Sequence, residues 1–239
     1  MKTTKEHRQA ILTVNKTKLY KILSRCTQRA STFLFDIYIA LGIYSMGDDM
    51  TKIDTKEFVD EFYKRIAEDN KVSDEEKQRA VAYSLGYTDE DIELGGDLGL
   101  GCGNPIQNAK LKDGEWLLDL GCGKGVDVFK AARELHGTGK AVGIDRLPEM
   151  IERAKFIRDK RGFDNADFLV SDIDNINLPD NTFDVVISNC VINLLEDKEK
   201  VYKEIFRVLK PGGRVSISDI IQIKALPKEI LADPIFHAT

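Results

Sequence analysis

The sequence has few of the residues from which metal centres and disulfide frameworks are built. Only three of its 239 residues are histidines, and no two of them are four positions apart, which excludes the paired-histidine zinc site of many proteases. The chain has four cysteines and no CxxC pair, which is unlike a small secreted protein held together by disulfides. These cysteines are Cys26, Cys102, Cys122 and Cys190. We therefore expect reduced thiols and a cytoplasmic location.

The sequence also lacks an excess of positive charge and a long apolar run. Its formal net charge of -5 gives no electrostatic reason to expect nucleic acid as a partner. The apolar stretch at residues 33–41 is too short, and too interrupted by Asp36, to span a membrane. Residues 1–30 nevertheless carry eight Lys or Arg against one acid. Three interpretations of this segment remain open: an amphipathic helix packed on the domain, a targeting or membrane-surface segment, and an extension unimportant to function.

Pattern and composition divide the chain into three parts: an N-terminal extension of unknown role at 1–49, a helical cap at 50–110, and the main domain at 111–239. In the cap, apolar residues at helical spacing predict a helix over residues 55–68. Ser73 and Glu76 match a capping box, which predicts a second helix that ends at Gly86 and the acidic cluster Thr88-Asp89-Glu90-Asp91. Residues 95–105 form a glycine-rich loop that we expect to lie close to a ligand or to close over it.

In the main domain, short apolar runs alternate with helical patterns. Strands are predicted at 116–120, 141–145, 166–170, 183–188 and 214–218, with helices between them. Pro148 suits the first turn of one such helix, and Pro211-Gly212-Gly213 is expected to stop another. This alternation predicts an α/β fold, an open and mainly parallel sheet with helices on both faces.

Acidic residues stand at the ends of the first three predicted strands. Asp119 precedes the glycine-rich turn 121–125, while Asp145 and Asp172 end the next two strands. Glycines in such a turn let backbone N–H groups approach a ligand, and the GxGxG spacing differs from that of dinucleotide sites. Three carboxylates without a cluster of cations suit a cationic ligand that lacks phosphate, such as S-adenosylmethionine. We assign Asp145 to the ribose hydroxyls, Asp172 to the adenine amine and Asp119 to the amino group of the ligand.

This constellation resembles the class I S-adenosylmethionine-dependent methyltransferases over residues 112–221. The resemblance implies a Rossmann-like fold, S-adenosyl-L-methionine as the cofactor and S-adenosylhomocysteine as the product. The full set of expected cofactor contacts is Asp119, Gly121, Cys122, Gly123, Lys124, Asp145, Arg146, Met150, Asp172, Ile173 and Asn189. Each single acid, taken alone, is also compatible with a helix N-cap.

Two cysteines lie close to where this fold places its reactive groups. Cys190 follows the fourth predicted strand, beside the expected position of the transferable methyl group, and Cys102 lies in the glycine-rich loop. An isolated cysteine is more often a small buried apolar residue than a reactive one. A second cysteine in a segment that can fold over the site favours a functional interpretation of Cys190.

Two segments around these cysteines resemble the arsenite methyltransferases, and the resemblance runs from about residue 51 to the end of the chain. They are GLGCGNP at 99–105 and SNCVINL at 188–194. The resemblance implies that Cys190 is a thiolate ligand of trivalent arsenic, a soft centre that favours sulfur. It implies that Cys102 joins a thiol–disulfide relay or helps to capture arsenic. It further implies a thiol reductant, arsenite or thiol-bound arsenic as the partner, and a role in arsenic detoxification.

The chain departs from this family in two ways. It lacks the family's further C-terminal cysteine and the extra N-terminal thiol of some members, for which Cys26 is too far upstream. Cys122 is expected to allow backbone approach to the cofactor rather than to bind arsenic. The chain would also lack the last strands of the fold, so that strand 214–218 is a bare edge, which makes a homodimer worth testing. Two alternatives remain: methyl transfer to an organic small molecule, and cofactor binding without turnover.

Overall fold

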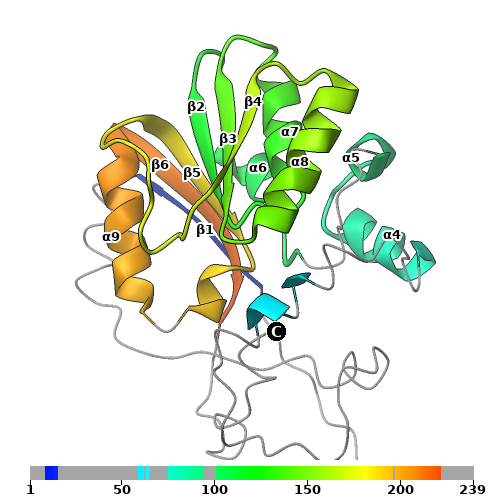
Figure 1. The fold of residues 1–239 in the computed structure, drawn as a ribbon, viewed down its shortest axis with the longest axis horizontal. Coiled ribbons are helices and arrows are strands. Elements are labelled where there is room, and N and C mark those ends of the chain that lie inside the picture. Colours follow the sequence, from blue (N-terminus) through cyan, green and yellow to red (C-terminus); the bar gives the residue numbers. More distant parts are fainter. Residues whose placement is uncertain are drawn as a thin grey trace, which may run out of the picture.

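The fold is built around a six-stranded sheet with the strand order β1-β6-β5-β2-β3-β4 (Figure 1). The computed structural model describes residues 9–15, 59–61, 63–64, 75–93, 101–195 and 197–221. Strands β2 to β6 are mutually parallel, and β1 runs antiparallel to β6. The strands are β1 (Gln9–Asn15), β2 (Trp116–Leu120), β3 (Lys140–Asp145), β4 (Ala166–Val170), β5 (Phe183–Asn189) and β6 (Leu209–Ile220).

Helices cover both faces of the sheet, because successive residues of its buried strands point to opposite faces and both sets are apolar. Leu117 of β2 packs in one core cluster with α6, α7 and α8, and its neighbour Leu118 packs in another with α9. Figure 1 shows α9 on the opposite side of the sheet from α7 and α8. The helices are α4 (Glu75–Ser84), α5 (Asp89–Glu93), α6 (Pro105–Ala109), α7 (Val126–Glu134), α8 (Pro148–Arg161), α9 (Lys198–Val208) and the 3₁₀ turn η2 (Ile192–Leu194).

The predicted parallel sheet with helices on both faces is confirmed. Pro148 opens α8, as its fixed φ favours at the first turn of a helix. The fifth predicted strand begins earlier than expected, because Leu209 already pairs with Phe183 across a register shift. The acidic residues after Gly86 do not simply end a helix. They open α5, where acids in the first turn interact favourably with the helix dipole.

The predicted bare edge is wrong, since β1 covers β6. Seven residue pairs join the two strands, from Gln9 with Ile220 to Asn15 with Arg214. Residues 10–14, Ala-Ile-Leu-Thr-Val, include β-branched residues that favour strands, although the positive charge around them does not indicate one. The described part of the N-terminal extension is therefore a strand rather than a helix, and the edge argument for a homodimer loses its basis. The apolar stretch 33–41 and Ser73 lie outside the described residues.

None of the helices in the described residues is both long enough and apolar enough to cross a membrane.

Candidate functional site

A cavity of about 570 Å³ opens at the carboxyl ends of β2, β3 and β5. The strand order reverses at β2, whose neighbours β3 and β5 are followed by helices on opposite faces. Ligands of open α/β sheets bind at such a switch point. All eleven residues predicted to contact the cofactor line this cavity, and so does Cys190.

The glycine turn between β2 and α7 brings the backbone to the wall of the cavity. Gly121, Gly123 and Gly125 have φ values of 67°, 52° and 93°, in the left-handed region that favours glycine. A Cβ atom on Gly121 would lie 2.6 Å from the side chain of Val191, and one on Gly125 would lie 2.7 Å from that of Phe168. The turn is thus open to a ligand on one side and in close contact with the protein on the other.

Asp145 fixes the shape of this turn. Its Oδ2 accepts a hydrogen bond from the backbone N–H of Gly123 at 3.0 Å, and its Oδ1 accepts one from that of Leu147 at 3.0 Å. Burial raises the pKa of Asp145, while these backbone donors act in the opposite direction. Each carboxylate oxygen has a further lone pair, so the side chain can still accept hydrogen bonds from ligand hydroxyls.

Asp119 is a buried carboxylate, 2% exposed, at the end of β2. Burial raises its pKa well above the ordinary value, and the charges of Asp127 and Asp145 raise it further. A cation bound in the cavity would stabilise the ionised form of Asp119. The electrostatics of this wall therefore suit a positively charged ligand.

Asp172 lies on a more open wall of the cavity. Arg146 joins it to the cap, with Nε 3.6 Å from Asp172 Oδ1 and Nη2 3.0 Å from Asp60 Oδ2. The buried side chains of Met150 and Ile173 add apolar surface beside this pair. Three residues of the predicted helix 55–68 line the cavity although the sequence did not predict it, namely Val59, Asp60 and Tyr63. The helical spacing of residues 55–68 gave no sign of which face meets a ligand.

Cys122 lies inside the turn, 9% exposed, and packs closely on Gly143. Burial raises the pKa of its thiol well above the ordinary value, and the neighbouring Asp145 and Asp119 raise it further. The side chain is therefore a protonated, packed thiol, which is a poor ligand for arsenic because the thiolate is the metal-binding form.

The other two thiols of the site meet. Cys102 and Cys190 are 88 residues apart in sequence and form a disulfide with Cα atoms 5.6 Å apart, a separation usual for this bond. Cys190 has a φ of 58°, a conformation uncommon outside glycine, and its N–H donates to Ser218 O at 2.8 Å. Residues held in such a conformation cluster at functional sites. Both sulfurs lie within 4.8 Å of a carboxylate oxygen of Asp219.

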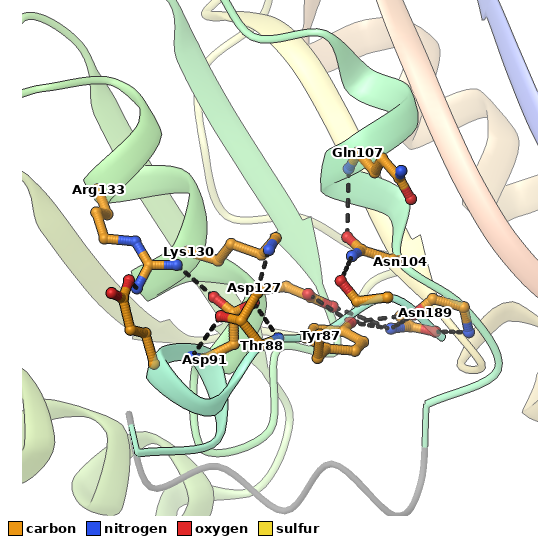
Figure 2. A network of polar contacts seen from close by, with 12 residues as sticks. Tyr87, Thr88, Asp91, Asn104, Gln107, Asp127, Lys130, Arg133 and Asn189 are labelled. Carbon is orange, nitrogen blue, oxygen red and sulfur yellow. Dashed lines mark hydrogen bonds and ion pairs between the residues drawn. The ribbon is translucent and has the colours of Figure 1, made fainter. Parts of the chain in front are cut away.

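Asn189 attaches the loop of Cys102 to the end of β5. Its Oδ1 accepts hydrogen bonds from the backbone N–H groups of Cys102, at 3.0 Å, and Gly103, at 3.2 Å. Its Nδ2 lies 2.9 Å from Gly103 O and 3.0 Å from Asp127 Oδ2 (Figure 2). Although Asn189 lines the cavity as predicted, its polar atoms are engaged mainly with the thiol-bearing loop.

A polar network behind Asn189 was not predicted. The hydroxyl of Tyr87 donates to Asp127 Oδ1 at 2.7 Å and lies 3.0 Å from Gly103 O. Burial and the charge of Asp127 raise the pKa of Tyr87, so its hydroxyl remains a donor. On the far side of this network in Figure 2, Asp91 of α5 binds Lys130 and Arg133 of α7. Asp127 gave no sequence signal, because an acid in the first turn of a helix is ordinary.

Comparison with known proteins agrees with this geometry. The sequence profile of a family described as "Methyltransferase domain" matches residues 111–237, more than half of the chain. The chain belongs to this methyltransferase family. An arsenite methyltransferase of Halobacterium salinarum is 40% identical over 172 residues, which cover 71% of this chain and 44% of that protein. The chain thus spans less than half the length of this relative.

Other members of the family resemble the chain less. A crystal structure of an arsenic(III) S-adenosylmethionine methyltransferase from Chlamydomonas reinhardtii is 35% identical, with a TM-score of 0.51, and the match covers 66% of this chain and 53% of that one. A phosphoethanolamine N-methyltransferase of Arabidopsis thaliana is 32% identical over 124 residues, 51% of this chain and 24% of that protein. Solved structures therefore support the class I S-adenosylmethionine-dependent methyltransferase fold.

Proposed function

We propose that this chain transfers a methyl group from S-adenosylmethionine to trivalent arsenic held by Cys190 and Cys102. The observation that carries the proposal is that Cys190, which lines an acid-lined cavity, is joined to Cys102, a thiol far away in the sequence that does not itself line the cavity. The similarity to proteins named arsenite methyltransferases supports it.

The donor set of the cavity fits the cofactor. We assign Asp145 to the ribose hydroxyls, Asp119 to the amino group and Asp172 to the adenine amine, with Met150 and Ile173 as apolar contacts. Buried carboxylates with raised pKa values favour a cation over a phosphate, and the positive charge of Arg146 is already paired with two acids. When bound, S-adenosylmethionine would supply a methyl group activated by its sulfonium.

The thiols fit the proposed acceptor. Trivalent arsenic is soft, so it favours thiolates over oxygen ligands. Arsenic bound by sulfur keeps a lone pair, so the chain need not supply a strong base to activate the acceptor. The main contribution of the protein is then to hold the acceptor close to the methyl group. Cys102 and Cys190 form a disulfide, although the sequence predicted reduced thiols, so a thiol reductant must first restore them. A reducing compartment such as the cytoplasm would then keep them reduced.

The test is methylation of arsenite by the purified chain in the presence of S-adenosylmethionine and a thiol reductant. Products are separated by liquid chromatography and arsenic is detected by mass spectrometry. We expect methylated arsenic from the wild type, and a loss of at least about 100-fold in Cys190→Ser because a serine hydroxyl does not replace a thiolate on arsenic. Cofactor affinity should be unchanged.

Cys26→Ser is the matched control, since it removes one thiol outside the described residues and should retain activity. Wild-type arsenite methylation by Cys190→Ser would overturn the assignment of the arsenic site.

The relative named phosphoethanolamine N-methyltransferase favours a second candidate, methyl transfer to an organic amine with Cys190 as a packing residue. In that case phosphoethanolamine is methylated, arsenite neither binds nor reacts, and Cys190→Ser keeps its activity. Cofactor binding without turnover of either acceptor would indicate a binding function alone.

A further inference from the structure

A carboxylate, that of Asp219, lies beside the two thiols of the proposed arsenic site. Trivalent arsenic forms three bonds, and in the part of the chain that the structure describes Cys102 and Cys190 supply two sulfurs. A carboxylate oxygen of Asp219 and the two sulfurs all lie within 4.8 Å of one another. Asp219 is therefore close enough to contact a group in the third position on an arsenic atom bound by the pair.

Backbone groups fix the carboxylate of Asp219 in this place. Its Oδ2 accepts a hydrogen bond from the N–H of Asn193 at 3.1 Å, and its Oδ1 accepts one from that of Ile220 at 2.8 Å. The side chain is buried, 8% exposed, at the carboxyl end of β6. The backbone O of the preceding residue, Ser218, accepts a hydrogen bond from the N–H of Cys190. The pairing of β5 with β6 therefore sets the position of the Asp219 carboxylate relative to the Cys190 thiol. Each carboxylate oxygen retains a lone pair that can accept another hydrogen bond.

The chemistry of arsenite shows what this lone pair can bind. A carboxylate is a hard ligand and does not compete with thiolates for soft arsenic. Arsenite, however, carries three hydroxyl groups. After a thiol reductant has opened the disulfide and become oxidised to its own disulfide, each protein thiol displaces one hydroxyl. One As–S bond forms, one As–O bond breaks, and the thiol proton leaves with the hydroxyl as water. Two such exchanges leave one hydroxyl on arsenic.

We propose that Asp219 accepts a hydrogen bond from the hydroxyl that remains on arsenic after Cys102 and Cys190 have bound it. This inference rests on the proposed function and adds a substrate preference to it. Arsenicals that bear one carbon substituent have only two exchangeable positions, so no hydroxyl remains once both thiols have reacted. The contact with Asp219 is therefore specific to inorganic, unmethylated arsenite and favours the first methyl transfer.

Two probes separate this role from a structural one. Arsenite leaves a hydroxyl on the bound arsenic, whereas phenylarsine oxide, bound by two thiols, leaves none. We would measure the affinity of the reduced chain for each probe by equilibrium dialysis and arsenic mass spectrometry. In Asp219→Ala, arsenite affinity should fall by about tenfold, the value of one hydrogen bond to a charged group. The affinity for phenylarsine oxide should not change.

Asp219→Asn should restore part of the arsenite affinity, because its carbonyl oxygen keeps an acceptor for the hydroxyl. Asp180→Asn, the same chemical change at an exposed residue paired with Arg207, should alter neither affinity. Capture of phenylarsine oxide also shows that each variant has folded around its two thiols.

The outcomes are distinguishable. An equal loss of both affinities in Asp219→Ala would mean that Asp219 acts by supporting η2 through Asn193, and it would overturn the inference. Unchanged arsenite affinity would overturn it as well, and in both cases the proposed function survives. If the reduced wild type captures neither probe, the proposed function fails and the inference fails with it.

Discussion

The acidic side of the cavity, with Asp119 and Asp145, is built from neighbouring strands, whereas the thiol side, with Cys102 and Cys190, joins segments 88 residues apart. On the acidic side, β2 and β3 pair directly and a short glycine turn completes the wall. On the thiol side, Asn189 supplies the hydrogen bonds that attach Cys102 and Gly103 to the end of β5, and Ser216 of β6 donates one to Pro105 O. Cofactor binding and acceptor binding should therefore fail independently when single residues are changed.

The largest expected effect is on the acidic side. Asp145→Ala removes the predicted ribose ligand and also releases the backbone donors of Gly123 and Leu147. We expect S-adenosylmethionine affinity to fall by at least about 100-fold, since charge-assisted hydrogen bonds are lost and the turn is freed. Calorimetric titration measures this loss. Capture of phenylarsine oxide by the reduced thiols should stay at the wild-type level.

Asp167→Ala is the matched control for Asp145→Ala, because it removes a carboxylate of β4 that pairs with Lys140 and does not line the cavity. It should bind the cofactor normally. Wild-type cofactor affinity in Asp145→Ala would contradict the assignment of this side, and a parallel loss of arsenical capture would contradict the independence of the two sides.

An intermediate effect is expected on the thiol side. Asn189→Ala removes the hydrogen bonds to Cys102 N, Gly103 N and Gly103 O, so the loop no longer holds the two thiols together. The affinity for phenylarsine oxide should fall by about tenfold, because the second thiol must be ordered at the moment of binding. Equilibrium dialysis of the reduced protein measures this.

Asn189→Ala is expected to lower the stability of the fold as well as the affinity for phenylarsine oxide. Asn165→Ala is the control for this loss of stability. It removes the hydrogen bond that the Asn165 side chain, just before β4, donates to Ala132 O at 2.8 Å. Both variants should lose about 1–3 kcal/mol of stability in chemical denaturation, the usual cost of a broken buried hydrogen bond. Only Asn189→Ala should lose arsenical affinity, and equal losses in the two variants would show that Asn189 has no special role in placing the thiols.

The difference between the two sides also explains what could be predicted from the sequence. The acidic side was predictable because apolar runs that end in Asp119 or Asp145 combine strand and site in one local pattern. The cysteine pair came from a family resemblance rather than from the physics of the sequence. The partners of Asn189, Tyr87 and Asp127, were missed because each lies in an ordinary local context, and only tertiary packing brings them together. Strand β1 was missed for a related reason, since its role depends on β6 about 200 residues later.

The smallest expected effect is a pH dependence that belongs to the acidic side alone. The pKa of Asp119 is raised by burial and by two neighbouring carboxylates, and a bound cation would lower this pKa and so favour release of a proton. The affinity for S-adenosylmethionine should therefore rise with pH up to the raised pKa of Asp119. The stability of the free protein should change in the opposite direction. Between the ordinary carboxyl pKa and the raised one, the folded state binds the extra proton, so stability falls as pH increases.

Calorimetry of cofactor binding in two buffers with different ionisation enthalpies measures this proton release. The wild type should release up to one proton, and Asp119→Asn, which cannot titrate, should release less and show a flatter pH profile. Phenylarsine oxide capture by the wild type and by Asp119→Asn should have the same pH dependence, because Asp119 belongs to the acidic side and the thiols' carboxylate neighbour is Asp219. If Asp119→Asn released as many protons as the wild type on binding the cofactor, the protons would come from another group and the assignment to Asp119 would be wrong.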